Sequence, residues 1–428
     1  MSAQALFDFI KSSPSAYHTV ESVRRALLAS GFTELYEADA WSLSPGGKYF
    51  VIRNGTSIIA FVNIPDASGY TIFASHSDSP SFRVKPDGES VGAYVSLPVE
   101  RYGGSIFYTW LDRPLSVAGR VIVRTEGGIS SQLVNLDSDT MTIPSVAIHF
   151  NRGVNDGYKF NPAKDMIPLL SSACGKGGFM KRIAEFVGCE EGEIIAHDLF
   201  LYNRDEGRIV GLNGEFALCP RLDDLACVYS TLTGFLSAKP KKNVPVLAVF
   251  DNEEVGNETK QGAKSTLLPS VLSRISVSEN EHYRRLASSF MVSADNAHAK
   301  HPNFPELSDS KNAPIMGEGI AVKYNANQRY ATDSISDAIF REICREASIK
   351  LQSYTNRADM LGGSTLGSDA DTLVSIPTVD IGIPQLAMHS ANEILALSDV
   401  EALVVAAAAV YSTDISFSRE KIALSQRV

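Results

Sequence analysis

Apolar runs rich in β-branched residues recur along the chain, and each ends in a cluster of polar residues. Four of them read YTIFASHSDSP, VPVLAVFDNEE, SSFMVSADNAH and TVDIGIPQLAMHS. Such runs predict buried strands that enter loops. Helical patterns lie between several of them, including DDLACVYSTLTGFLSA, ISDAIFREICREASI and VEALVVAAAAVYSTDI, so we expect an α/β fold with a mostly parallel sheet. The polar clusters would then meet at the edge where such sheets bind ligands.

The segment from Glu89 to about Leu212 has a different pattern, with short alternating runs such as AYVSL and SIFYTW. Within it, GRVIVRTEGGISSQLVNL predicts a hairpin that turns at Glu126-Gly127-Gly128. We therefore expect two domains: a discontinuous α/β domain, residues 1–88 and 213–428, and an inserted β-rich domain, residues 89–212. The inserted domain would serve assembly or form a lid.

Length and charge narrow the class of protein. The chain has 428 residues, 44% of them hydrophobic, which is more than one core usually spans. Its net charge of −10 argues against nucleic acid or an anionic membrane as the main partner. The five cysteines form no C-x-x-C pair, which argues against a disulfide framework or a thiolate zinc site. With no export signal and no membrane-spanning run, the cytoplasm is the expected location.

Histidines and carboxylates dominate the residues that follow the apolar runs: His76, Asp78, Asp223, Asp224, Glu253, Glu254, Asp295 and His389. Imidazoles with carboxylates suit zinc, and a carboxylate shared by two ions roughly 3.5–4 Å apart would build a dinuclear hydrolytic site. If Glu253 and Glu254 lie on extended backbone, their side chains point to opposite sides. One would then bind metal while the other handles a proton.

Each of these features also has an ordinary structural explanation. His76-x-Asp78 could be a surface accident, the Glu253-Glu254 pair a solvated face, and Asp223-Asp224 a helix cap. Asp295 could be a turn residue and His389 a core histidine. Five separate coincidences, each after an apolar run or at a helix start, are less plausible than one common site.

Seven motifs, taken in order, resemble those of the aspartyl aminopeptidase family: SHSDSPSFRVKP, TWLDRPLSVAGR, CPRLDDL, FDNEEVGNETKQGA, SADNAHAKHPN, KYNANQRYAT and PQLAMHSANE. The resemblance covers nearly the whole chain. It implies a dinuclear zinc exopeptidase whose catalytic α/β domain is interrupted by a dimerisation domain. It also implies a homo-oligomer, a tetrahedral dodecamer built from dimers, that removes the N-terminal residue from peptides with a free N-terminus.

The same resemblance implies a role for each motif residue. His76 and Asp295 would hold one zinc ion, Glu254 and His389 the other, and Asp223 would bridge both. Other first-row divalent ions could replace zinc. Glu253 would be the general base, and Asp78 would orient His76 from behind.

Substrate selection rests on a further set of residues. The family pattern points to Lys323, and to His149 acting across the dimer, as the groups that favour an N-terminal Asp or Glu. In the ordinary explanation, Lys323 is a surface amine and His149 a strand-end residue. The family's GTTIG-like loop reads GSTLG here, and Gly363 and Gly367 would let the backbone approach a bound peptide, although a plain turn explains them nearly as well. Two alternatives stay open: a noncatalytic chamber-forming scaffold, and a dinuclear metal hydrolase of another substrate class.

Overall fold

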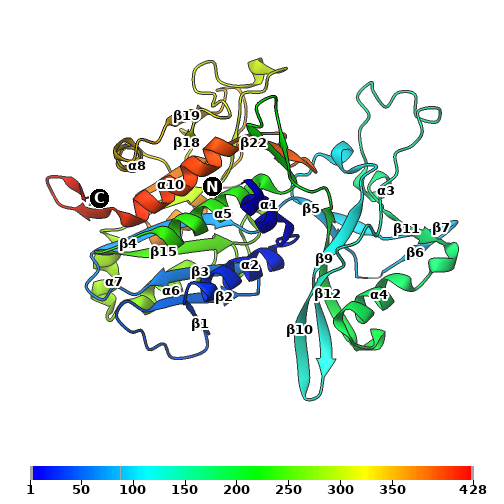
Figure 1. The fold of residues 1–428 in the computed structure, drawn as a ribbon, viewed down its shortest axis with the longest axis horizontal. Helices are drawn as coiled ribbons and strands as arrows, with labels where there is room; N and C mark the ends of the chain where they lie inside the picture. The colour runs from blue at the N-terminus through cyan, green and yellow to red at the C-terminus, as the bar shows by residue number, and fades with distance from the viewer. Residues whose placement is uncertain (1–2, 87, 426–428) are drawn as a thin grey trace.

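A nine-stranded sheet forms the centre of the molecule (Figure 1). The structure is a computed structural model that describes residues 3–86 and 88–425, so the expected domain ends at residues 1 and 428 lie outside it. The strands stand in the order β1 (Thr33–Leu35), β2 (Lys48–Arg53), β3 (Ser57–Val62), β15 (Asn243–Phe250), β4 (Gly69–His76), β16 (Phe290–Ala294), β20 (Thr378–Gly382), β18 (Ile320–Tyr324), β19 (Leu351–Thr355). The central strands β15, β4, β16 and β20 are parallel, which confirms the expected mostly parallel sheet.

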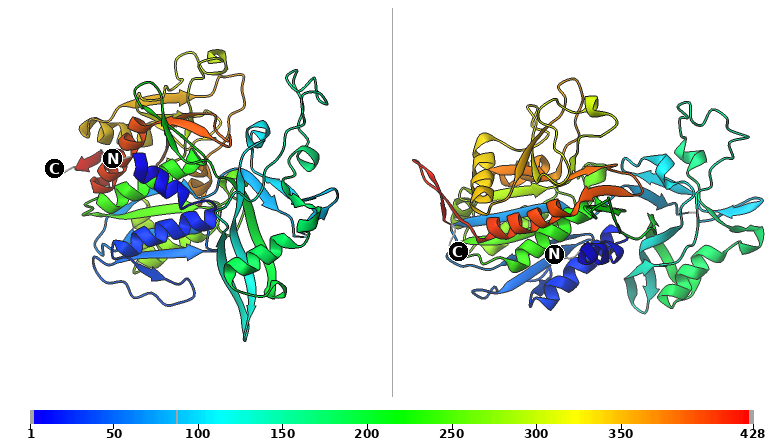
Figure 2. Two further views of the ribbon diagram at one scale, coloured as in Figure 1. Left: turned by 45° about the vertical axis from the view of Figure 1, so that its right-hand side comes forward. Right: turned by 45° about the horizontal axis from the view of Figure 1, so that its top comes forward.

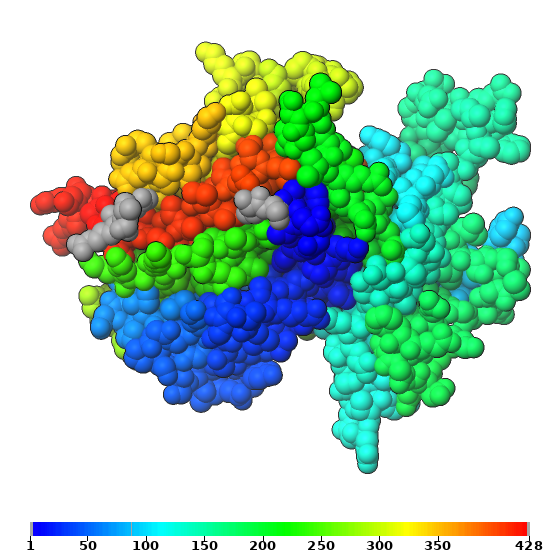
Figure 3. All heavy atoms as spheres, viewed as in Figure 1, coloured from blue at the N-terminus to red at the C-terminus, as the bar shows by residue number. Residues whose placement is uncertain are grey.

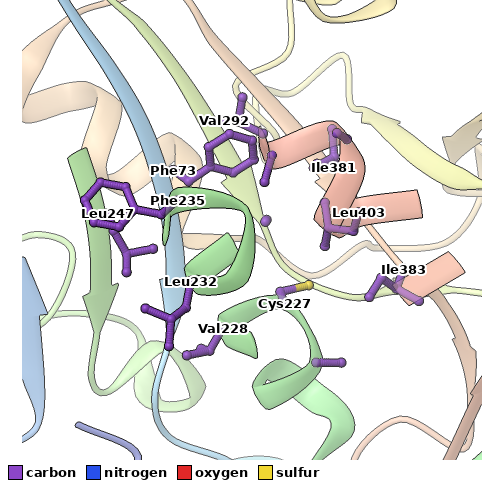
Figure 4. Packing of buried hydrophobic residues seen from close by; sticks show 14 of the residues in the cluster. Phe73, Cys227, Val228, Leu232, Phe235, Leu247, Val292, Ile381, Ile383 and Leu403 are labelled. Carbon is purple, nitrogen blue, oxygen red and sulfur yellow. The ribbon is translucent and has the colours of Figure 1, made fainter. Parts of the chain in front are cut away.

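Helices cover both faces of this sheet. One face packs against α1 (Ala3–Lys11), α2 (Ala16–Ala29), α5 (Leu222–Ser237), α8 (Ser334–Glu346) and α10 (Leu397–Ser412). The other packs against α6 (Leu267–Ile275) and α9 (Leu366–Val374), with α7 (Glu279–Leu286) alongside. Figure 4 shows Phe235 of α5, Leu403 of α10 and Phe73 of β4 among the buried side chains of the first of these layers. Burial on both faces explains why β4 and β15 are mostly apolar along their whole length and do not alternate with polar residues.

A second sheet stands beside the α/β body and forms a separate lobe (Figures 2 and 3). Its order is β10 (Gly128–Asn135), β9 (Leu115–Thr125), β12 (Ile194–Asn203), β5 (Ser81–Val84), β8 (Val99–Tyr102). Gly127 has a left-handed φ of 80° at the tip between β9 and β10, so the hairpin expected at Glu126-Gly127-Gly128 is confirmed. β5, which precedes residue 89, pairs within this sheet.

Smaller elements complete this lobe. They are the sheet β11 (Leu169–Ser172), β7 (Tyr94–Ser96), β6 (Ser90–Val91), the helices α3 (Pro162–Asp165) and α4 (Gly178–Val187), and the 3-10 turns η1 (Phe107–Trp110), η2 (Ala173–Gly175) and η3 (Glu191–Glu193). The boundaries 88/89 and 212/213 stay a prediction.

A third sheet lies between the body and the lobe. It contains β13 (Arg208–Val210), β14 (Phe216–Cys219), β22 (Glu393–Ala396), β21 (Pro384–Leu386) and β17 (Ala297–His298). The run TVDIGIPQLAMHS therefore forms two strands in two sheets, β20 and β21, rather than one strand that ends in a loop. The remaining elements are η4 (Glu253–Val255), η5 (Pro305–Leu307) and the hairpin β23 (Asp414–Phe417), β24 (Ile422–Ser425). No helix in the described residues is long and apolar enough to cross a membrane.

Candidate metal centre

Residues from distant parts of the chain converge where the central strands end. His76 ends β4, Asp295 directly follows β16, and Glu253 and Glu254 follow β15 in η4. Asp223 enters from the start of α5, where its φ of −85° and ψ of 110° are not helical. His389 follows β21 and has a left-handed φ of 67°. The convergence expected at one edge of the sheet is confirmed for these residues.

Asp223 lies between the two histidines. Its Oδ1 is 3.5 Å from His76 Nε2, and its Oδ2 is 3.6 Å from His389 Nε2. Asp295 Oδ1 lies 3.9 Å from the same atom of His76, and Glu254 Oε1 lies 3.3 Å from that of His389. The five side chains thus form two groups that share the Asp223 carboxylate.

The other ring nitrogen of each histidine has an oxygen neighbour. His76 Nδ1 is 3.1 Å from the carbonyl oxygen of Asp78 and 3.4 Å from its Oδ1. His389 Nδ1 is 3.3 Å from the carbonyl oxygen of Gly104. A proton on Nδ1 satisfies these oxygens, so that a ring which gives up any proton on Nε2 offers a metal ion a lone pair on the side of Asp223. This is the tautomer in which an imidazole binds a metal ion.

Glu253 and Glu254 lie in a 3-10 turn and not on extended backbone, so the premise used to separate their roles is wrong. Their amides both donate to Asp78, at 3.3 Å to Oδ1 and 3.3 Å to Oδ2. The turn begins at Asn252, whose φ of 64° reverses the chain after β15. As a result, one carboxylate oxygen of each glutamate lies within 4.8 Å of a ring nitrogen of His76, close enough for all three to share a metal ion.

The centre holds more negative charge than its own residues neutralise. Burial raises the pKa of Glu253, and the neighbouring Asp295 and Glu254 raise it further, well above its usual range. Burial lowers the pKa of His389, but Asp223 and Glu254 together raise it to about 12. One buried oxygen each of Asp223, Asp224 and Glu254 has no hydrogen-bond partner among the described residues. Buried carboxylates need a compensating charge, so this donor set of imidazole nitrogens and carboxylate oxygens fits zinc.

Lys323 is buried at the rim and is not a surface amine. Only 2% of the residue is exposed, and its Nζ lies 3.5 Å from Asp295 Oδ2 and 5.5 Å from the ring centre of Tyr330. Burial lowers its pKa, but Asp295 and further acids raise it overall, so the ammonium stays charged. A fixed positive charge therefore stands beside the centre.

The other residues expected to bind substrate lie in different surroundings. His149 is exposed on the long loop between β10 and α3. A Cβ on Gly363 would meet nothing within 4 Å, whereas one on Gly367, in the first turn of α9, would lie 2.3 Å from Asp380 Oδ1. Close packing against Asp380 therefore requires a glycine at 367. The substrate roles of all three stay predictions.

Two further carboxylates support the centre: Glu393, which sequence reasoning missed, and Asp224, which it listed without a role. Glu393 is buried and accepts from the amides of Asp223, at 2.9 Å, and His389, at 2.6 Å. Asp224 Oδ2 accepts from the amide of His76 at 3.2 Å. Glu393 closes the motif PQLAMHSANE, four residues after His389, and that spacing was the available signal.

A cavity of about 390 Å³ lies between the α/β body and the second sheet. Asp78, Asp223 and His389 line one part of it, and Arg120 and Asp198 line another. This cavity therefore reaches the centre from the side of the lobe.

Imidazoles and carboxylates gathered at the strand ends of an α/β sheet are typical of metal-dependent hydrolases, and we assign this protein to that class. Comparison with known proteins gives the family. Residues 9–411 match the family model described as aminopeptidase I zinc metalloprotease (M18), and the chain belongs to this M18 family. It is a metallo-aminopeptidase.

Three relatives illustrate the likeness. A probable M18 family aminopeptidase 2 of Clostridium acetobutylicum is 43% identical, over 93% of this chain and 95% of that protein. The chain in a cryo-EM structure of the Ape4 and Nbr1 complex is 32% identical with a TM-score of 0.93, over 96% of this chain and 85% of that one. The S. cerevisiae mApe1 dodecamer is 28% identical with a TM-score of 0.83, over 96% of both chains.

Proposed function

We propose that this aminopeptidase uses two zinc ions per subunit. His76 and Asp295 would hold one ion, Glu254 and His389 the other, and Asp223 would bridge them. The observation that carries the proposal is the position of Asp223, with one carboxylate oxygen toward each histidine. The unpartnered oxygens of Asp223 and Glu254 support it, because a bound cation would satisfy both.

Zinc ions in such a site supply positive charge that acidifies water and polarises a carbonyl group. Glu253 would accept the proton of the attacking water and return it to the leaving amine. Asp78 would fix this glutamate through the backbone of the η4 turn and would hold His76 by its Nδ1.

A free amino terminus would bind among the carboxylates, which explains cleavage one residue at a time. We place the acidic side chain of an N-terminal Asp or Glu near Lys323, the charged group beside Asp295. Gly363 and Gly367 would lie along the peptide, and His149 of a second subunit would complete the pocket. The exposure of His149 within one chain is compatible with a contact across a dimer.

Assembly is the second part of the proposal. The predicted inserted domain, residues 89–212, would form a dimer contact, and dimers would assemble into a dodecamer like that of mApe1. Val146, Ile148 and Phe150 are 58%, 49% and 88% exposed on the loop that carries His149, and apolar side chains of this kind favour burial against a partner. The five cysteines are unpaired, which supports a reducing compartment such as the cytoplasm.

The test uses the purified full chain and a panel of peptides that differ only in the first residue, with one N-blocked peptide as control. Chelation should abolish hydrolysis and zinc should restore it, with two ions per chain by elemental analysis. Acidic first residues should react fastest and the blocked peptide not at all. Full activity of metal-free protein would contradict the zinc mechanism. Two bound ions without turnover would favour the scaffold, and hydrolysis of phosphoesters or N-acyl groups instead of peptides would favour the other hydrolase class.

A further inference from the structure

A short segment of the lobe, Tyr102–Ile106, runs along the Glu254 and His389 half of the metal centre. It leaves the end of β8 in the second sheet and has the sequence YGGSI. Its residues are not among the metal ligands proposed above. Each end of the segment nevertheless contacts residues that hold that centre.

Tyr102 contacts both sides of the turn that carries the two glutamates. Its hydroxyl donates to Asp78 Oδ2 at 2.6 Å and accepts from Asn252 Nδ2 at 2.9 Å. Asp78 in turn accepts from the amides of Glu253 and Glu254. These bonds form a closed ring around the η4 turn. Burial and the charge of Asp78 raise the pKa of Tyr102, so the hydroxyl remains a donor.

Asn252 is itself held on its other side. Its Oδ1 accepts from Thr259 Oγ1 at 2.9 Å and from Gln261 Nε2 at 2.7 Å. The ring of Tyr102 packs edge-on against Phe200 of β12, with 5.4 Å between the ring centres. The hydroxyl is therefore fixed by the second sheet, while its partners belong to the α/β body.

The two glycines pass against the ligands themselves. A Cβ on Gly103 would lie 3.2 Å from Glu254 Cβ, closer than side chains normally pack. The Gly104 carbonyl oxygen is 3.3 Å from His389 Nδ1, and a Cβ there would lie 3.3 Å from the same nitrogen. The amide of Ile106 donates to the carbonyl oxygen of His389 at 2.9 Å. The left-handed backbone of His389 is thus held from both its ring and its main chain.

We propose that the segment Tyr102–Ile106 positions the Glu254 and His389 half of the centre, with Tyr102 as a positioning residue for the turn that carries Glu253 and Glu254. The inference rests on the proposed zinc site. Groups that orient metal ligands commonly change metal affinity or activity by about 10- to 100-fold when they are removed. The lobe would then contribute to the chemistry within its own chain, independently of any contact across a dimer.

The first test compares Gly103→Ala with Gly127→Ala. Both positions have left-handed backbone, with φ of 70° and 80°, so both variants carry a similar conformational strain. Only the Cβ at 103 meets Glu254, because nothing lies within 4 Å of the one at 127. Titration of chelator-treated protein with zinc, in competition with a chromophoric chelator, should show one of two sites weakened at least tenfold in Gly103→Ala. The site affinities of Gly127→Ala should stay within twofold of the unaltered protein.

The second test compares Tyr102→Phe with Tyr202→Phe. If Gly103→Ala fails to fold, this second test alone decides whether the segment positions the metal ligands. Tyr202 also lies in the second sheet, but its hydroxyl donates to Asn135 Oδ1 at 2.7 Å and not to Asp78. Tyr102→Phe should weaken zinc about tenfold and lower kcat about tenfold with KM within threefold, whereas Tyr202→Phe should change none of these.

The outcomes separate this inference from the proposed zinc site. If the unaltered protein binds two zinc ions and Tyr102→Phe keeps both affinities and kcat within twofold, the inference is wrong and the zinc site stands. If the unaltered protein binds no zinc, the zinc site is wrong and the inference falls with it. If Tyr102→Phe binds zinc more weakly and Tyr202→Phe does not, the inference is supported, whatever the substrate proves to be.

Discussion

Carboxylates are buried at the metal centre and partly buried where the lobe meets α2, a contact that we call the seam, but their oxygens find different partners. At the seam, Asp198 of β12 accepts from Tyr17 at 3.0 Å, Arg83 at 2.7 Å and Arg120 at 3.0 Å. At the centre, one buried oxygen each of Asp223, Asp224 and Glu254 lacks a hydrogen-bond partner in the part of the chain that the structure describes.

The pKa directions follow the same division. Burial raises the pKa of Asp198, but Arg120 and Tyr17 lower it overall, whereas burial and acidic neighbours raise that of Glu253. Donors within the chain satisfy the seam carboxylate, whereas oxygens at the centre remain without a donor and can bind a cation. Donors within the chain thus distinguish a structural acid from a functional one.

The largest effect is expected at Glu253. Glu253→Gln should lower kcat by about 10²- to 10⁴-fold, because the amide cannot accept the proton of the attacking water. Bound zinc, measured by elemental analysis, should not change. Glu258→Gln, on an exposed side chain five residues away, is the control and should keep full turnover. Near-normal turnover in Glu253→Gln would remove this residue from the mechanism.

Zinc should increase the free energy of unfolding, and this increase should depend on the carboxylates of the centre and not on Asp198 at the seam. At a free concentration 100 times the dissociation constant, each site should add about 2.7 kcal/mol to the free energy of unfolding. Denaturant unfolding with and without zinc measures this increment. Asp223→Asn should lose most of it, and Asp198→Asn should keep it. An equal increment in both variants would contradict the distinction between the two regions.

A substitution of Lys323 tests whether the ammonium group beside the centre binds the substrate. Lys323→Ala should lower kcat/KM about 10- to 100-fold for peptides with an N-terminal Asp or Glu, since a charge-assisted contact contributes about 1.5–3 kcal/mol. Peptides with a neutral first residue should change little. Lys350→Ala, at a side chain that is 76% exposed, is the control. Equal losses for acidic and neutral peptides would show that Lys323 supports only Asp295.

The smallest effect is expected at the seam. Asp198→Asn should lower the free energy of unfolding by about 1 kcal/mol, because the charged hydrogen bonds are partly screened by solvent. The pKa of Asp198 is lower in the folded than in the unfolded chain, so its contribution is complete above about pH 3.9 and is lost as the pH falls through the folded value. Unfolding at several pH values, with the exposed Asp139→Asn as control, measures this. If the difference in free energy of unfolding between the unaltered protein and Asp198→Asn grew as the pH fell, the predicted direction of the pKa shift would be wrong.

Much of this arrangement could be predicted from local patterns. The apolar runs before His76, Glu253 and Asp295 indicated buried strands, and parallel strands bring their ends to one edge. The family resemblance added roles for Asp223 and His389. The only signal for Glu393 was its spacing from His389, because the sequence around a single glutamate after a polar loop does not distinguish a buried acceptor from a solvated side chain.

By itself, the sequence determined the α/β class, the β9–β10 hairpin and the residue types of the centre, since these depend on periodicity, turn chemistry and composition. Tertiary structure decided the rest. The division of TVDIGIPQLAMHS between two sheets, the 3-10 turn that brings Glu253 and Glu254 together, and the burial of Lys323 all depend on packing between distant segments. The contacts of Tyr102 and Gly103 with the centre belong to this second kind, because they join a strand of the lobe to a turn about 150 residues later, and no local pattern carries information across that separation.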